Sequence, residues 1–383
     1  MDSSLGRLLL EFLLLANAFV QSICLIRRAC NYYVYTHWAP ALLILAARQG
    51  SAFITRKLLD GGADVRWESD FWVNERANGR DYNKSSKEHP ILYAATSGHI
   101  AITELLLEHD ADIEYKGREG CTPLLLAAQN NQIPVARLLI SRGADILAED
   151  MRGKSSIYVS LCEGFYEMLE MLLASLQRVP FSPEYIKKGM QDVLLAATVG
   201  SHLEWVQYAI SRGADINYQR SKYDPTALLV AARSADPAIV QLLVENGADP
   251  NIKKPQQPQL RRPRSTETPL LQAARNTDHS ETTIRLLLDR GAIPHGPDDY
   301  QALLLLIERG DVSSFRLLVD HGAPLKHRLT RIPTLMRTAL LSGQSAIVDL
   351  LLEMGMTPSE RDLEIVRNIS PEGLGMLQSR QER

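Results

Sequence analysis

The chain has 383 residues, a formal net charge of −3 and 45% apolar residues. This composition supports a sizeable core and excludes a globally disordered chain. The near-neutral charge lacks the basic excess on which nucleic-acid binding depends, so we expect no nucleic-acid partner. The four cysteines form no CxxC pair and are too few for a disulfide framework, which indicates reduced thiols in a cytoplasmic or nuclear protein.

Sequence motifs of catalysis are missing from the chain. It has no GxGxxG, GxxxxGK[ST], HExxH or GxSxG pattern. Its His, Asp and Glu residues show no zinc-ligand spacing. We therefore expect a protein that is not an enzyme and that carries no cofactor, no metal and no catalytic residue.

The first predicted element is an apolar helix over residues 8–26, where 15 of 19 residues are apolar. Its length is enough to span a bilayer. However, Glu11, Asn17, Gln21 and Ser22 share one stripe of the helix, which favours an amphipathic helix packed on protein. For residues 1–40 we keep three interpretations: a plain N-terminal cap, a docking module, or a membrane element, the last being the least favoured.

Residues 41–357 repeat one pattern. The tripeptide Gly-Ala-Asp begins at Gly62, Gly143, Gly213 and Gly247. Each copy follows a pair of small residues, and all copies except the one at Gly213 also follow a pair of leucines. The base step is 33 or 34 residues, and the step of 70 from Gly143 to Gly213 implies a degenerate repeat at 155–173. We count eight repeats, and we expect those at 155–173 and 302–319 to be locally less stable.

One repeat shows the physical logic of the pattern. Thr122 is an N-cap residue, and Pro123 takes the first helical position, where its missing N–H costs nothing. Ala127 and Ala128 keep this first helix thin, so that a neighbouring helix can approach closely. A second helix at 134–141 follows, and Gly143 supplies the left-handed conformation after its end.

This repeat resembles the ankyrin repeat in Thr122-Pro123-Leu124, Ala127-Ala128, Leu138-Leu139 and Gly143-Ala144-Asp145. The resemblance implies an all-α solenoid of stacked helical hairpins that binds another protein along its concave side. The family usually has His after Thr-Pro-Leu. Here Leu125, Leu229 and Leu271 stand in that place, so we expect more apolar packing there.

Two insertions interrupt the array. The insertion at 66–87 carries Trp67, Phe71 and Trp72, which are either binding anchors or residues that fold back and cap the first repeats. The insertion at 252–265 contains the basic, proline-rich run KKPQQPQLRRPR, which is either a solvated linker or a site for acidic partners. Residues 358–383 are predicted to form a capping helix and a tail.

Partner contacts are predicted on the residues that follow the small pairs, because these should face the concave side. The candidates there are Arg48, Gln129, Asn130, Arg233 and Arg275. The arginines suit carboxylates or a polar peptide. Cys162, on a degenerate first helix, is predicted to fill the core.

A second resemblance concerns the N-terminal segment. Leu8-Leu9-Leu10-Glu11, Arg27-Arg28 and the tyrosine-rich stretch at 32–37 are similar to the F-box-type segment that precedes ankyrin repeats in some fungal proteins, although the opening Leu-Pro is missing.

Taken together, we expect a monomeric, non-catalytic recognition scaffold or adaptor for a protein whose identity the sequence does not give. The alternatives are a substrate-recognition subunit that binds ubiquitin-ligase core subunits of the cullin type through its F-box-like N-terminus, and a membrane-tethered scaffold.

Overall fold

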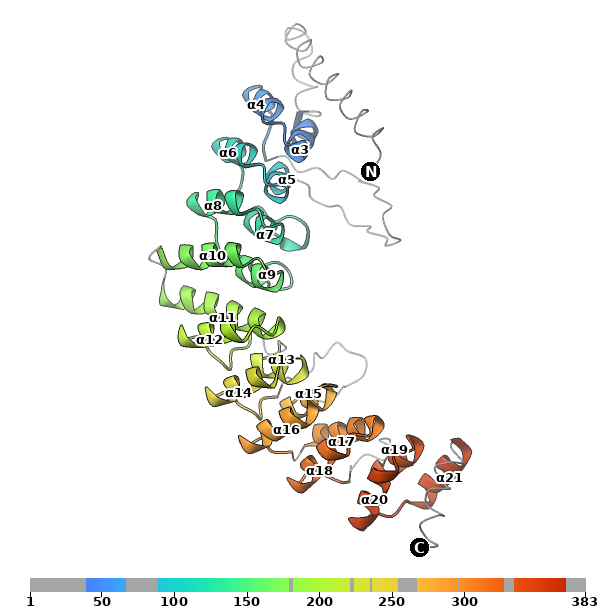
Figure 1. Ribbon diagram of the computed structural model, residues 1–383. Helices are drawn as coiled ribbons and strands as arrows, with labels where there is room; N and C mark the ends of the chain where they lie inside the picture. Colours follow the sequence, from blue (N-terminus) through green and yellow to red (C-terminus); the bar gives the residue numbers. More distant parts are fainter. Residues whose placement is uncertain are drawn as a thin grey trace. The chain divides into compact units, whose positions relative to one another are not determined.

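The computed structural model describes residues 39–66, 89–178, 182–220, 224–234, 236–253, 267–294, 296–326 and 334–369. Nineteen α-helices, α3 to α21, lie in these ranges (Figure 1). The expected all-α class is therefore confirmed. The helices divide into two compact units, residues 1–192 and residues 193–383.

In the first unit, each hairpin consists of a first helix and a second helix. The first helices are α3 (Ala39–Gln49), α5 (Pro90–Ser97), α7 (Pro123–Gln129) and α9 (Ser156–Cys162). The second helices are α4 (Ala52–Asp60), α6 (Ile100–Glu108), α8 (Ile133–Ser141) and α10 (Tyr166–Arg178). First helices pack on first helices and second helices on second helices, which makes two layers (Figure 1).

The second unit repeats this arrangement. The boundary between the units falls within α11 (Pro183–Val199), which is followed by the second helix α12 (Leu203–Ser211). The later first helices are α13 (Ala227–Ser234), α15 (Pro269–Arg275), α17 (Pro297–Arg309) and α19 (Leu335–Leu341). Their second helices are α14 (Pro237–Glu245), α16 (Ser280–Asp289), α18 (Val312–Asp320) and α20 (Ser345–Glu353), and α21 (Glu360–Ile369) packs on α19.

The described helices α3 to α20 form nine hairpins, one more than the eight repeats counted from the sequence. The degenerate repeat at 155–173, which the sequence predicts, is formed by α9 and α10, so the count of eight was one hairpin too low. Ser155 replaces threonine as the N-cap of α9, and its Oγ accepts a hydrogen bond from Tyr158 N at 3.3 Å. A serine hydroxyl caps a helix as well as a threonine does, so the hairpin survives the loss of the motif.

Local chemistry explains the hairpin ends. Thr122 Oγ1 accepts a hydrogen bond from Leu125 N at 3.3 Å and caps α7. After α8, Gly143 has φ +93°, a left-handed conformation that a β-carbon disfavours. Asp110 adopts φ +63° at the equivalent place after α6, which aspartate tolerates better than most residues.

The core lies between the two helix layers of each unit. Ala127 and Ala128 are fully buried, which is consistent with close packing of neighbouring first helices. The three leucines that replace the family's usual histidine are also buried, as the expected apolar packing requires: Leu125, Leu229 and Leu271.

Several sequence predictions lie outside the described residues. They concern residues 1–38, the aromatic insertion beyond Arg66, the basic run beyond Lys253 and the tail beyond Ile369. Within the described part of the chain, no helix has the length and apolarity needed to cross a membrane.

Candidate binding surface

The loops that join successive hairpins are built on an aspartate turn. Asp145 Oδ1 accepts a hydrogen bond from Leu147 N at 2.9 Å, and the aspartates of other Gly-Ala-Asp marks accept equivalent bonds two residues on. This bond fixes the direction in which the loop leaves the second helix. The third residue of the repeated tripeptide therefore positions the loop that carries the candidate surface.

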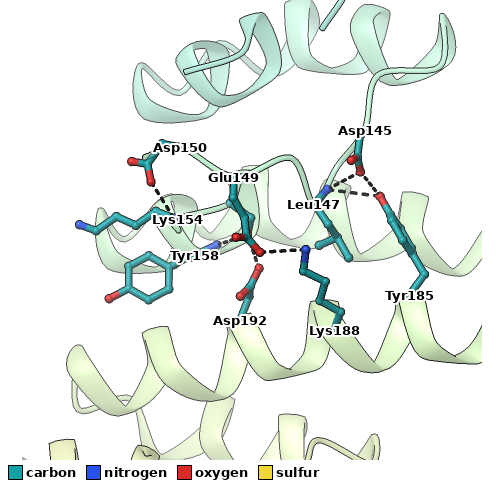
Figure 2. Close-up of polar contacts among 10 residues, drawn as sticks. Asp145, Leu147, Glu149, Asp150, Lys154, Tyr158, Tyr185, Lys188 and Asp192 are labelled. Carbon is teal, nitrogen blue, oxygen red and sulfur yellow. Dashed lines mark hydrogen bonds and ion pairs between the residues drawn. The ribbon is translucent and has the colours of Figure 1, made fainter. Parts of the chain in front are cut away.

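In the first unit, α11 supports the loop at residues 145–155, which we call the 145–155 loop (Figure 2). Tyr185 Oη donates a hydrogen bond to the Asp145 carboxylate and accepts one from Leu147 N at 3.3 Å. Burial, together with the bond to Asp145, raises the pKa of Tyr185. The phenol therefore stays protonated and remains a donor at neutral pH.

Two further contacts join α11 to the same loop (Figure 2). Lys188 Nζ lies 2.8 Å from Glu149 Oε1, and Ser155 Oγ donates to Asp192 Oδ2 at 2.5 Å. Burial lowers the pKa of Lys188, but the hydrogen bond to Glu149 and the negative charges of Glu149, Asp192 and Asp145 together outweigh burial and raise the pKa of the amine. The loop is thus fixed at its start, its middle and its end.

The tip of the 145–155 loop is ordered and yet open to solvent. Asp150 Oδ1 accepts hydrogen bonds from the backbone N–H groups of Arg152 and Lys154, each at 2.8 Å. Met151 N donates to Glu119 O in the preceding loop at 2.8 Å, and Arg152 Nη2 lies 3.2 Å from Glu119 Oε2. Met151 itself is 82% exposed. An apolar side chain is therefore presented to solvent on a fixed backbone.

The tip is followed in the chain by α9. Lys154 Nζ stands 5.4 Å from the centroid of the Tyr158 ring, which is a cation–π geometry. Cys162 is exposed, so the prediction that it fills the core is wrong. The reason is its register: Ser160 and Leu161 take the buried positions of the small pair, and Cys162 follows them at the helix end.

The predicted contact residues of the first unit lie on this layer of first helices. Arg48 is exposed, and its Cζ lies 5.8 Å from the Tyr93 ring of the next first helix. The partly buried Gln129 forms a hydrogen bond with Cys121. Burial raises the pKa of the Cys121 thiol. Asn130 Nδ2 donates to Leu126 O at 2.9 Å, so this side chain ends α7 while remaining exposed.

In the second unit, two asparagines join successive loops. Asn217 Nδ2 donates to Gly247 O at 3.1 Å, and its Oδ1 accepts from Asp249 N at 2.9 Å. Asn251 bonds Gly291 O and Ile293 N in the same manner, at 2.9 and 2.8 Å. Each amide side chain therefore bridges one loop to the next.

Arg233 and Arg275 occupy equivalent positions in the last turns of α13 and α15, two helices that pack together. Arg233 is exposed and has no ion-pair partner among the described residues. Arg275 Nη1 lies 3.8 Å from Glu267 Oε1. Arg309 lies in the last turn of the next first helix and donates to Ala274 O at 2.5 Å and to Asn276 O at 2.8 Å, so it holds the end of α15.

The structure thus brings Arg233 and Arg275 onto one surface of the second unit and places Arg48, Gln129 and Asn130 on the first-helix layer of the first unit. Trp67, Phe71 and Trp72 lie outside the described residues. The roles of all eight residues in partner binding stay predictions.

Sequence reasoning missed Met151, Arg152 and Arg309. The run Asp150-Met151-Arg152-Gly153 was a usable signal, because Asp and Gly three residues apart are typical of a tight turn with an exposed tip. Among the described side chains, no three His, Cys, Asp or Glu residues gather as metal ligands would.

The sequence pattern of the ankyrin repeats matches residues 43–150 and 156–254, which together make up more than half of the chain. The ankyrin repeat and KH domain-containing protein mask-1 of Caenorhabditis elegans is 29% identical over 171 residues, 45% of this chain and 6% of that protein.

Two other relatives differ in their additional modules and in their source. Human ankyrin repeat and SOCS box protein 6 is 27% identical over 164 residues, 41% of this chain and 37% of that protein. The putative ankyrin repeat protein FPV031 of fowlpox virus is 35% identical over 71 residues, 18% of this chain and 20% of that protein. The similarity therefore covers well under two thirds of each relative.

Proposed function

Because the chain belongs to the ankyrin repeat family, we propose that it is an adaptor that holds a partner protein on its first helices and connecting loops. Ankyrin repeats are protein-interaction modules rather than catalytic domains. The finer assignment to this surface is supported by one observation above all. The 145–155 loop presents Met151 and Arg152 on a backbone that α11 and the preceding loop hold in place.

Preorganisation makes such a loop suitable for binding. A loop that is already ordered loses little conformational entropy when a partner binds, so more of the contact energy appears as affinity. Methionine is adaptable in shape and fits irregular apolar pockets. Arg152 beside it supplies a positive charge for an acidic group of the partner. The side chains of Arg152 and Glu119 are 65% and 51% exposed, so their ion pair is weak and a carboxylate of the partner can replace Glu119.

The surface of the second unit is suited to a partner that carries carboxylates. Arg233 and Arg275 extend from neighbouring helices, and the contact of Arg275 with Glu267 is long for an ion pair. A guanidinium binds a carboxylate through two parallel hydrogen bonds, a geometry that lysine does not offer. We assign these two arginines to an acidic segment of the partner.

The test compares capture of the partner by four versions of the full chain. Arg233→Ala with Arg275→Ala should weaken binding about tenfold or more, and so should Met151→Glu, because anchor residues at interfaces exceed about 1.4 kcal/mol on substitution. The matched controls are Arg285→Ala with Arg316→Ala on second helices and Ile369→Glu, at a side chain that is 67% exposed. Equal binding by the test and control variants contradicts the assignment to this surface.

A second candidate function rests on residues 8–37, whose sequence resembles an F-box-type segment. In this case the repeats select a target and the N-terminal segment recruits ubiquitin-ligase core subunits. The name of the human relative likewise joins ankyrin repeats to a second module, a SOCS box. A pull-down with the full chain and with a chain lacking residues 1–37 tests this candidate. Core subunits that only the full chain retrieves support it, and their absence from both samples refutes it.

A further inference from the structure

The α3–α4 hairpin has one side that the described chain does not cover. The other hairpins of the first unit stack on it from the side of α5 and α6 (Figure 1). On its opposite side no described helix packs. A repeat at the end of a stack needs a polar or covered outer side, because a hairpin cannot bury its own apolar face.

The register of the hairpins shows which side chains this side exposes. One backbone hydrogen bond recurs at the turn between the first and second helix of each hairpin, and it aligns the four hairpins of the first unit residue by residue. The bonds are Ser51 N to Ala46 O, His99 N to Ala94 O, Gln132 N to Ala127 O and Phe165 N to Ser160 O.

Position by position, the first hairpin is the exposed one. Ile54 is only partly buried, whereas the residues in its place in the next three hairpins are at most 1% exposed: Ile102, Val135 and Met168. Leu42 is likewise partly buried, and its equivalents are buried: Pro90, Pro123 and Ser156. Leu45 is 41% exposed, whereas its equivalents Tyr93 and Leu126 are partly buried and its equivalent Val159 is 6% exposed.

A neighbouring aromatic residue enlarges this apolar surface. Phe53 is 63% exposed at the second position of α4. The three following hairpins carry smaller or charged residues at that position: Ala101, Pro134 and Glu167. We call Leu42, Leu45, Phe53 and Ile54 the end patch.

We propose that residues 8–26 of the same chain cover the end patch as an amphipathic cap. Fifteen of these 19 residues are apolar, and their polar residues share one helical stripe that would face solvent. Twelve residues separate position 26 from the start of α3. Extended, such a linker reaches about 40 Å, whereas an 11-residue helix is only about 16 Å long, so the segment reaches the whole patch.

The other end of the array shows that one helix is enough to close a hairpin. The single helix α21 packs on α19 and buries Val366 completely. Arg337 Nη1 lies 3.8 Å from Asp362 Oδ1 across this contact. The outward residues of α21 include Glu360, Arg361 and Glu364, which give the end a polar surface.

The test measures thiol reactivity in the full chain after Cys24, Cys30, Cys121 and Cys162 have been replaced by serine. Leu45→Cys is compared with Ile100→Cys, because Leu45 and Ile100 are 41% and 42% exposed against the described chain. A cap over the end patch should slow maleimide labelling at position 45 at least tenfold relative to position 100. Phe12→Asp with Phe19→Asp should then restore fast labelling at position 45.

Three results would overturn the proposal. Equal labelling rates at positions 45 and 100 would show that nothing covers the patch. Protection that disappears on dilution would assign the patch to a second copy of the chain. Protection that needs phosphatidylcholine and phosphatidylserine vesicles would place residues 8–26 in a membrane instead.

Discussion

The asparagine bridges of the second unit make a quantitative prediction about how the loops are joined. Asn217→Ala removes two hydrogen bonds, one to Gly247 O at 3.1 Å and one from Asp249 N at 2.9 Å. Each bond contributes about 0.5–1.5 kcal/mol, and water replaces part of this at an exposed side chain. We expect a local loss of about 1–2 kcal/mol, which corresponds to an about 5- to 30-fold larger equilibrium constant for local opening.

Hydrogen exchange reads this loss at single amides. The Asp249 amide donates to Asn217, whereas the Ile293 amide donates to Asn251 and serves as an internal control in the same sample. Asn217→Ala should accelerate exchange at Asp249 and leave Ile293 unchanged, and Asn251→Ala should do the reverse. Equal exchange at both amides in both variants would refute the view that these side chains bridge the loops.

Three further predictions concern stability. The pKa of Tyr185 is raised in the folded chain. Its contribution to the free energy of unfolding is therefore complete below the tyrosine pKa of about 10 in the unfolded chain and is lost as pH rises above that value. Urea unfolding between pH 7 and pH 10.5 should show this loss in the wild type and not in Tyr185→Phe. Leu125→Ala should cost about 2–5 kcal/mol in calorimetry or urea unfolding because Leu125 is 1% exposed, whereas Met151→Ala at the loop tip should cost less than about 0.5 kcal/mol. Burial opposes ionisation of Asp311, but hydrogen bonds from Ser280, Ser314 and Ser313 outweigh burial and lower the pKa of its carboxyl group. The stabilisation from Asp311 should therefore be present at neutral pH and decrease as pH falls below about 4. In urea unfolding, Asp311→Asn should destabilise the chain at pH 7, and its difference from the wild type should shrink as pH falls toward 3.

Periodic features were predictable from the sequence because each hairpin repeats the same local chemistry. Thr122, Pro123 and Gly143 mark a helix start and a helix end by mechanisms that act within a few residues. The repeated marks therefore predicted the fold class and the helix pairs, including the degenerate pair that Ser155 begins.

Features that break the period were not predictable in the same way. The loop tip at Met151 is held by Tyr185 and Lys188 from α11, a helix of 17 residues, and nothing in the repeat itself announces that support. Arg309 escaped notice because α17 carries Leu306 and Ile307 where most first helices carry a small pair, so the sequence does not show the register of α17. Cys162 was misplaced for the same reason.

The measurement that tests the central claim most directly is hydrogen exchange of the full chain with and without the captured partner protein. The account predicts slower exchange in the 145–155 loop and in the last turns of α9, α13 and α15, with the second helices unchanged. Slower exchange confined to the second helices α8, α10, α14 and α16 would contradict it, because the partner would then bind the opposite layer.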